Sequence, residues 1–125
     1  MVQVKIYVGH ATGWNFEEKL YQPLEDSALA DKHELVFPHD SEEFFNSKKF
    51  LREECDVFIA EVSRDSTGLG IELGWAEEFD VPVMCAHMKD SEVSRALEVV
   101  TGKILEYENS RELVEIVEEA VSEMS

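Results

Sequence analysis

The chain has 125 residues, the length of one domain, and its hydrophobic fraction of 44% is enough for a buried core. Its apolar residues form short runs, with no stretch of about 20 that would span a membrane, and its first residues lack the basic flank of a signal peptide, so we expect a cytoplasmic protein with no membrane partner. The formal net charge of −17 would repel a nucleic-acid backbone, which argues against polymeric DNA or RNA as a partner.

The chain opens with a predicted strand, a loop and a helix. Residues 2–8 alternate in polarity and are rich in β-branched side chains, which is typical of a strand. Residues 9–13 interrupt this pattern with two glycines. Residues 15–28 then have the apolar spacing of one amphipathic helix, carried by Phe16, Leu20, Leu24 and Ala28.

A second strand, a short helix and a third strand follow. Residues 34–37 predict a strand that ends in the turn-forming residues 38–40. Asn46-Ser47 is expected to cap a short helix that ends near Cys55. Residues 56–62 are nearly all apolar between polar ends, which predicts the central, buried strand of a parallel sheet.

The second half of the chain continues the alternation. Residues 63–70 predict a polar loop, residues 71–79 a helix and residues 81–86 a fourth strand. Residues 103–107 predict a fifth strand, and residues 112–124 an amphipathic helix. The glutamates on the outer side of this last helix are expected to form a solvated face.

Strands that alternate with helices through short loops predict one α/β domain. We expect a flavodoxin-like or Rossmann-like three-layer sandwich with a mostly parallel five-stranded sheet. In such sheets, ligands bind at the carboxyl ends of the strands, near the point where the strand order reverses. This rule predicts that residues 9–10, 39–40 and 63–70 and His87 lie together along the carboxyl edge of the sheet, which we call the rim.

The glycine-containing stretch 66–74, Ser-Thr-Gly-Leu-Gly-Ile-Glu-Leu-Gly, follows the predicted central strand and opens a helix. Its backbone N–H groups are expected to point at whatever occupies the rim. Glu72 is predicted in the first helical turn, where the helix dipole favours the ionised carboxylate of a nucleophile. The alternative is an ordinary helix glutamate beside turn-forming glycines. The spacing matches neither the dinucleotide fingerprint nor a Walker loop.

Residues 56–62, Asp-Val-Phe-Ile-Ala-Glu-Val, followed by the stretch 66–74, resemble the signature of the nucleoside 2-deoxyribosyltransferase family, which includes the 2'-deoxynucleoside 5'-phosphate N-hydrolases. The opening strand that ends in Gly9, with aromatic residues just beyond it, is also similar to that family. The resemblance extends over residues 4–86. It implies one nucleoside 2-deoxyribosyltransferase-like domain over residues 1–125.

The resemblance implies that Glu72 attacks the anomeric carbon of a 2-deoxyribosyl group and expels the base. A carboxylate suits this chemistry, because N-glycosidic cleavage builds positive charge on the sugar. A second acidic group is then expected to protonate the leaving base. The family's aspartate before the central strand has no counterpart in residues 45–50. Asp40, Glu42 and Glu43 are the conjectured substitutes, with solvated loop charges as the alternative.

The resemblance also implies substrate-binding residues around Glu72. Phosphate-selective members of the family carry a serine after the glycine of the first strand and another before the Gly-x-Gly stretch, and here these positions are His10 and Ser66. A 5'-phosphate is thus permitted but not demanded, because Ser66 and Thr67 serve equally well as helix caps. The predicted substrate-binding residues are Gly9, His10, Asp40, Asn46, Ser66, Thr67, Gly68, Gly70, Ser94 and Arg95.

Three histidines, His10, His39 and His87, fall at predicted carboxyl ends of strands, and their convergence would suggest a metal. No His-Glu-x-x-His or Cys-x-x-Cys motif accompanies them, so we expect no metal and no cofactor, and we favour His10 as a ligand contact. Trp14 and Phe16 follow the first loop. We expect them to pack on the core, with stacking on a nucleobase as the alternative.

These expectations favour an enzyme that cleaves the N-glycosidic bond of a deoxynucleoside or deoxynucleoside 5'-monophosphate, by hydrolysis or base transfer, with Glu72 as nucleophile. The alternative is a non-catalytic module that binds a nucleoside or nucleotide on the same fold. Both functions take a small-molecule partner. The resemblance further implies a homo-oligomer, a dimer or larger, in which Ser94 or Arg95 completes the pocket of a neighbouring subunit.

Overall fold

The structure is a computed structural model that describes residues 3–40 and 44–124. In this part of the chain, five strands form one sheet in the order β2-β1-β3-β4-β5, and each neighbouring pair is parallel. The strands are β1 (Lys5–His10), β2 (Glu34–Val36), β3 (Val57–Glu61), β4 (Val83–Met88) and β5 (Ile104–Tyr107). The predicted parallel sheet with a central third strand is therefore confirmed.

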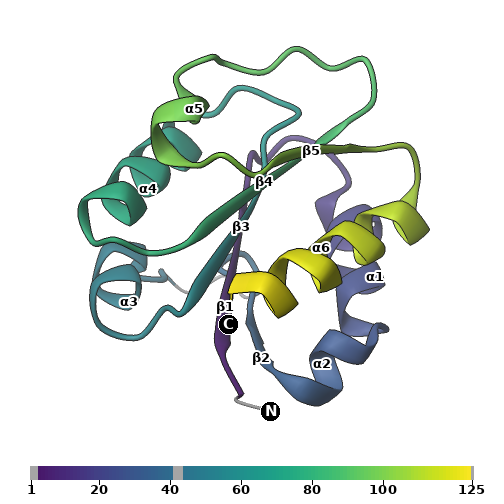
Figure 1. Cartoon of the computed structure of the whole chain (residues 1–125), viewed down its shortest axis with the longest axis horizontal. Helices are drawn as coiled ribbons and strands as arrows, with labels where there is room; N and C mark the ends of the chain where they lie inside the picture. The colour runs from purple at the N-terminus through teal and green to yellow at the C-terminus, as the bar shows by residue number, and fades with distance from the viewer. Residues whose placement is uncertain (1–2, 41–43, 125) are drawn as a thin grey trace.

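Helices cover both faces of the sheet (Figure 1). One layer contains the π-helical turn η1 (Glu17–Tyr21) and the helices α1 (Gln22–Glu25), α2 (Ala28–Lys32) and α6 (Ser110–Met124). The opposite layer contains α3 (Ser47–Glu53), α4 (Thr67–Glu78) and α5 (Leu97–Val100), of which α5 was not predicted from the sequence. The predicted three-layer sandwich is confirmed.

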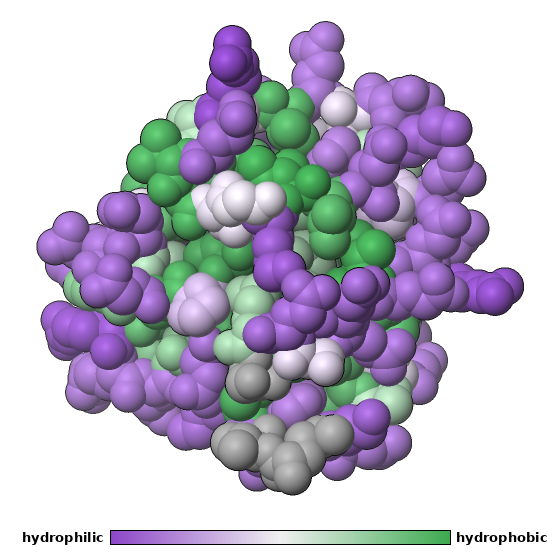
Figure 2. All heavy atoms as spheres, in the orientation of Figure 1, coloured by the Kyte–Doolittle hydropathy of each residue, from purple (hydrophilic) through white to green (hydrophobic). Residues whose placement is uncertain are grey.

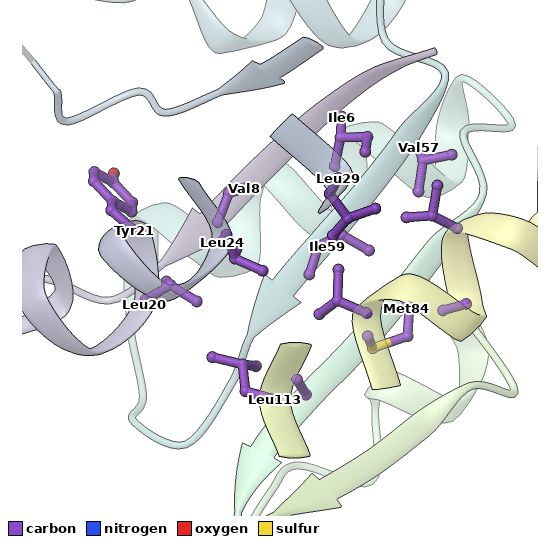
Figure 3. Close-up of a cluster of buried hydrophobic side chains, with 14 of the residues drawn as sticks. Ile6, Val8, Leu20, Tyr21, Leu24, Leu29, Val57, Ile59, Met84 and Leu113 are labelled. Atoms are coloured by element: carbon purple, nitrogen blue, oxygen red, sulfur yellow. The ribbon is translucent and has the colours of Figure 1, made fainter. Parts of the chain in front are cut away.

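The two faces of the sheet carry separate cores, because successive strand side chains point in opposite directions. Ile6, Val8 and Ile59 point towards η1, α1, α2 and α6, where Figure 3 shows them with Leu20, Leu24 and Leu113. Tyr7 and Phe58 belong to the core on the side of α3 and α4. All five strand side chains are fully buried. The alternation therefore directs Tyr7 towards the helix that carries Glu72.

The prediction of a single helix over residues 15–28 is wrong. The chain forms η1 and α1, breaks, and restarts as α2, because Ser27 adopts an extended backbone with φ −89° and ψ 169°. Its Oγ accepts a hydrogen bond of 3.2 Å from the N–H of Leu29, which makes Ser27 the N-cap of α2. Leu29 is consequently buried, whereas Ala28 is exposed.

The helix after the central strand begins at Thr67, not at Ile71 as predicted. Ser66 has an extended backbone, and its Oγ accepts a hydrogen bond of 3.2 Å from the N–H of Leu69, so Ser66 is the N-cap. The glycines at positions 68 and 70 are helical and do not form a loop. Glu72 therefore lies in the second turn of α4, and the expected first-turn position is wrong.

Helix α6 buries an apolar face and exposes an acidic one, as predicted. Leu113 and Val117 are fully buried, whereas Glu115, Glu119 and Glu123 are exposed. Figure 2 shows hydrophilic side chains along the side of the molecule where Figure 1 places α6. Within the described part of the chain, no helix combines the length and the apolar character that crossing a membrane requires.

Gly9 allows β1 to approach Phe58 and Leu69 closely. A Cβ atom at this position would lie 2.7 Å from Cε1 of Phe58 and 3.1 Å from Cδ1 of Leu69. We expect Gly9→Ala to lower the free energy of unfolding by about 1–3 kcal/mol, because the buried ring must shift to make room. Gly74→Ala is the control, since its Cβ would meet nothing within 4 Å, and alanine should stabilise the helix by about 1 kcal/mol. Urea denaturation measures both, and equal stabilities would contradict the prediction.

Candidate active site

An open cavity of about 670 Å³ lies at the carboxyl ends of β1 and β2, beside the amino end of α4. The strand order reverses at β1, which is where ligands bind in open parallel sheets. The volume suits a small organic molecule. The cavity is lined by His10, Thr12, Pro38, His39, Phe44, Phe45, Ser47, Ser66, Gly68, Leu69 and Glu72.

A chain of two hydrogen bonds holds the Glu72 carboxylate at this cavity. The Tyr7 hydroxyl donates to Oε2 of Glu72 at 2.5 Å, and the same hydroxyl lies 2.7 Å from Oγ of Ser47. Because Tyr7 has a single hydroxyl proton, Ser47 must be the donor in the second bond. The chain Ser47–Tyr7–Glu72 thus joins α3, β1 and α4, and its middle member is fully buried.

The Tyr7 hydroxyl is a permanent donor in this arrangement. Burial, followed by the charge of the neighbouring Glu72 carboxylate, raises the pKa of Tyr7 well above its ordinary value. A tyrosine that keeps its proton leaves the carboxylate as the acceptor. One oxygen of Glu72 is therefore held in a fixed direction, and the carboxylate is oriented before any ligand arrives.

The opposite wall contains a second hydrogen-bonded group. Nδ1 of His10 lies 2.8 Å from the carbonyl oxygen of Ala11, which can only accept, so Nδ1 carries the proton. Nε2 of His10 lies 2.5 Å from the Tyr21 hydroxyl and accepts from it. The Tyr21 oxygen in turn accepts the N–H of His39 at 3.2 Å. Burial lowers the pKa of His10 to about 4, which keeps the ring neutral at physiological pH.

Aromatic side chains supply the apolar part of the lining. Phe45 is half-buried, and its ring stacks on Tyr7 with a centroid distance of 6.0 Å. Phe44 lines the cavity and is 92% exposed. A cavity that is lined by both aromatic rings and a carboxylate suits a ligand with one flat apolar part and one polar part.

Comparison with known proteins shows which proteins the chain is similar to. No protein-family model matches the chain. A protein of Methanococcoides burtonii named 2'-deoxynucleoside 5'-phosphate N-hydrolase 1 is 38% identical over 80 residues, an alignment that covers 64% of this chain and 63% of that relative. The chain thus matches less than two thirds of the relative's length.

Solved structures share the fold. The CMP N-glycosidase of Clostridium botulinum has a TM-score of 0.62 at 21% identity and covers 91% of this chain and 98% of its own. The 2-desoxiribosyltransferase of Leishmania mexicana has a TM-score of 0.63 at 16% identity and covers 92% and 97%. A conserved protein of Enterococcus faecalis V583 has a TM-score of 0.65 at 12% identity and covers 94% and 99%.

The predicted resemblance to the nucleoside 2-deoxyribosyltransferase family is confirmed.

Four of the residues predicted from this deoxyribosyltransferase resemblance meet at the cavity: His10, Ser66, Gly68 and Glu72. His10 faces it with both ring nitrogens already hydrogen-bonded, and Ser66 uses its hydroxyl to cap α4.

Other predicted binding residues lie behind or beside the lining. Gly9 is buried beneath Phe58, and Asn46 caps α3, its Oδ1 accepting the N–H of Lys49 at 3.1 Å. Thr67 and Gly70 are exposed positions of α4 outside the lining set. None of these four is among the residues that line the cavity.

Asp40 borders a different hollow, at the outer edge of β2, together with Glu25 and His33. The structure therefore does not bring Asp40 into the lining beside Glu72. The two other conjectured acids, Glu42 and Glu43, lie outside the described residues.

Ser94 and Arg95 border a separate hollow of about 370 Å³, near α5. The Arg95 guanidinium is exposed, with its Nε 3.7 Å from a carboxylate oxygen of Glu98. Within one chain, these two residues do not reach the cavity that contains Glu72.

Of the three histidines considered for a metal site, only two lie close together in the described part of the chain. The rings of His10 and His39 lie 5.2 Å apart, centroid to centroid. His87 is on β4, and β3 separates that strand from β1 in the sheet. Its Nδ1 lies 3.1 Å from Oγ of Ser91. Among residues 3–40 and 44–124, no group of three or more His, Cys, Asp or Glu side chains is placed to hold a metal ion.

Trp14 and Phe16 pack against the core, as the favoured interpretation predicted. The Trp14 indole donates to the Ala11 carbonyl, and the Arg64 guanidinium lies 4.3 Å from the centre of its ring. Phe16 lies 4.3 Å from the His10 ring, centroid to centroid. Stacking on a nucleobase by either residue is not favoured.

Sequence reasoning missed Tyr7 and Ser47. A signal for Tyr7 was present, because strand alternation places it on the face opposite to Ile6 and Val8, among Phe58 and the residues of α4. Ser47 gave no signal of its own, since a serine at a helix start is ordinarily explained by capping.

His10 provides a test of this geometry by NMR. Because its pKa in the folded protein is about 4, against about 6.5 in an unfolded chain, its Cε1–H resonance should titrate near pH 4. The lowered value means that the unfolded chain binds the proton first, so stability should fall as the pH drops from about 6.5 towards 4. A titration midpoint of 6.5 or higher for the folded protein would show that Nε2 is not held as described.

Proposed function

We propose that the chain cleaves the N-glycosidic bond of a deoxynucleoside or of its 5'-monophosphate, with Glu72 as the nucleophile. The observation that carries this proposal is the carboxylate of Glu72 at a cavity of about 670 Å³, oriented by a buried Tyr7 hydroxyl at 2.5 Å. The names of the similar proteins describe N-glycosidic cleavage or deoxyribosyl transfer, which supports the same reaction class.

In this proposal, the hydrogen bond from Tyr7 gives the two carboxylate oxygens of Glu72 different roles. Oε2 is the acceptor from Tyr7, and Oε1 attacks the anomeric carbon. The sugar gains positive charge as the bond to the base lengthens, and the nearby anion stabilises that charge. Since Tyr7 keeps its proton, its donor bond limits the rotation of the carboxylate throughout the reaction.

The cavity admits two substrate forms in this proposal. Among the described lining residues there is no Lys or Arg, and a neutral nucleoside needs no cationic side chain to bind. A 5'-phosphate would have to be held by backbone N–H groups and hydroxyls at the amino end of α4, where the helix dipole favours an anion. Water or a second base then accepts the sugar, which makes the enzyme a hydrolase or a transferase.

The decisive test is incubation of the purified protein with each deoxynucleoside and each deoxynucleoside 5'-monophosphate, with chromatography of the free base. Glu72→Ala is expected to lower base release by about 1,000-fold or more, because it removes the nucleophile. Glu77→Ala is the matched control, since Glu77 is exposed on the same helix, and it should retain full activity. Ligand binding without base release by the wild type would instead support a non-catalytic nucleoside-binding module.

We further propose that the chain forms a homo-oligomer in which Ser94 or Arg95 reaches the cavity of a neighbouring subunit. This proposal is supported by the resemblance to the deoxyribosyltransferases and by the exposure of both residues beside a hollow of about 370 Å³.

Light scattering should give a mass of at least twice the 14.3 kDa of one chain. Arg95→Ala should weaken substrate binding without changing that mass, because its surface pair with Glu98 contributes little to folding. A mass equal to one chain would contradict the proposal.

A further inference from the structure

The cavity holds few groups that can exchange a proton. Of the described lining residues, only His10, His39 and Glu72 carry an imidazole or a carboxyl group. If Glu72 is the nucleophile, it cannot also protonate the leaving base in the same step. The search for a proton donor among the described lining therefore reduces to two imidazoles.

Both ring nitrogens of His10 are already used in hydrogen bonds within the protein. Its side chain is 4% exposed, its Nδ1–H donates to the Ala11 carbonyl, and its Nε2 accepts from Tyr21. A second proton on Nε2 would face the Tyr21 hydroxyl, which would then have to give up its donor role. Burial also lowers the pKa of His10 to about 4. His10 is therefore neutral and has no proton directed at the cavity.

His39 differs from His10 in each of these respects. It is exposed and lines the cavity. Its backbone is fixed by the hydrogen bond from its N–H to the Tyr21 hydroxyl at 3.2 Å, and its ring lies 5.2 Å from His10 and 5.9 Å from Phe16, centroid to centroid. The ring thus has a defined place at the cavity wall and access to whatever enters.

The charged groups around His39 are acidic. Burial raises the pKa of Tyr21, the hydrogen bond from the His39 N–H opposes this rise, and the charges of Asp40, Glu17 and Glu72 add to it. Asp40 belongs to the same loop, Glu17 to η1 and Glu72 to α4. His10, on β1, is the facing group that stays neutral. The elements that surround Tyr21 and the His39 backbone thus carry three carboxylates and no described Lys or Arg of the cavity lining.

We propose that His39 is the general acid that protonates the leaving base, an inference that rests on the proposed function. The imidazolium donates its N–H proton to a ring nitrogen or oxygen of the base while the bond between C1' and the base nitrogen breaks, its electron pair going to the base. Oε1 of Glu72 forms a bond to C1' in the same step. The base leaves neutral, His39 becomes neutral, and the sugar is held as an ester.

The second half of the reaction restores both residues. Water attacks C1', the ester C–O bond breaks with its electron pair returning to Glu72, and His39 takes up the proton that the water loses. A second base can replace the water, in which case His39 accepts the proton of the attacking base. Histidine suits both roles, because it changes charge between about pH 5 and 8.

The test compares His39→Gln with the wild type on the substrate that the wild type cleaves fastest. We expect kcat to fall by about 100-fold or more. The wild type should lose activity as the pH rises through the range in which histidine deprotonates, and His39→Gln should lack this descending limb. His87→Gln is the matched control, since its ring is bound by Ser91 outside the cavity. Thermal unfolding should show that His39→Gln is folded, because position 39 is exposed.

A second substrate separates acid catalysis from positioning. The base of 7-methyl-2'-deoxyguanosine already carries a positive charge and leaves as a neutral molecule without a proton, so His39→Gln should cleave it at nearly the wild-type rate while 2'-deoxyguanosine is cleaved far more slowly. Equal losses on both substrates would overturn the assignment. If the enzyme takes only pyrimidines, the pH profile alone decides, and an unchanged descending limb overturns the assignment.

The failure of this inference can be distinguished from the failure of the proposed function. Base release that requires Glu72 but survives His39→Gln would remove His39 and leave the N-glycosidic reaction in place. Loss of activity in Glu42→Gln or Glu43→Gln, with His39→Gln active, would transfer the acid role to that glutamate. No base release by the wild type from any substrate would overturn both proposals.

Discussion

The hydrogen bond from Tyr7 to Glu72 forms because the sheet buries the Tyr7 side chain, and the same bond orients the Glu72 carboxylate at the cavity. Tyr7 is fully buried, and an unpaired buried hydroxyl costs about 1–3 kcal/mol, so folding itself requires partners for it. Those partners are Ser47 on α3 and Glu72 on α4. The energy that packs two helices against β1 therefore also orients the carboxylate. A ligand meets a group whose position was already set by the core.

The parallel sheet explains why the cavity has two chemically different walls. Along β1, Tyr7 points towards α3 and α4, whereas His10, at the end of the strand, points towards η1, where Tyr21 and Phe16 hold it. One wall presents an anion fixed by a hydroxyl, and the other presents imidazoles next to aromatic rings. The loop after β2 supplies His39 to this second wall, near His10 and Phe16. The strand β1 thus lies between the loop that carries the proposed proton donor and the helix that carries the proposed nucleophile.

Much of the fold was predictable because strand patterns are local. The apolar run at residues 56–62 identified the central strand, and the alternation of elements identified the parallel sheet. Helix boundaries were less predictable, because Ser27 and Ser66 interrupt or start helices through capping bonds that compete with apolar periodicity. The position of Glu72 at the rim followed from the strand–loop–helix order. Its partner Tyr7 could not be assigned, since that needs the packing of two distant segments.

The high net charge has less influence on the choice of ligand than its size suggests. Charges separated by more than about 8 Å of water at physiological ionic strength are largely screened, and the acidic face of α6 lies in the helix layer opposite α4 (Figure 1). Within the described lining, Glu72 is the single carboxylate, and it faces the same space as the amino end of α4. Local groups, not the overall charge, therefore determine whether a phosphate is accepted. A neutral nucleoside needs nothing beyond the groups already in place, whereas a phosphate could accept the proton of the Ser66 hydroxyl, whose oxygen already accepts the N–H of Leu69.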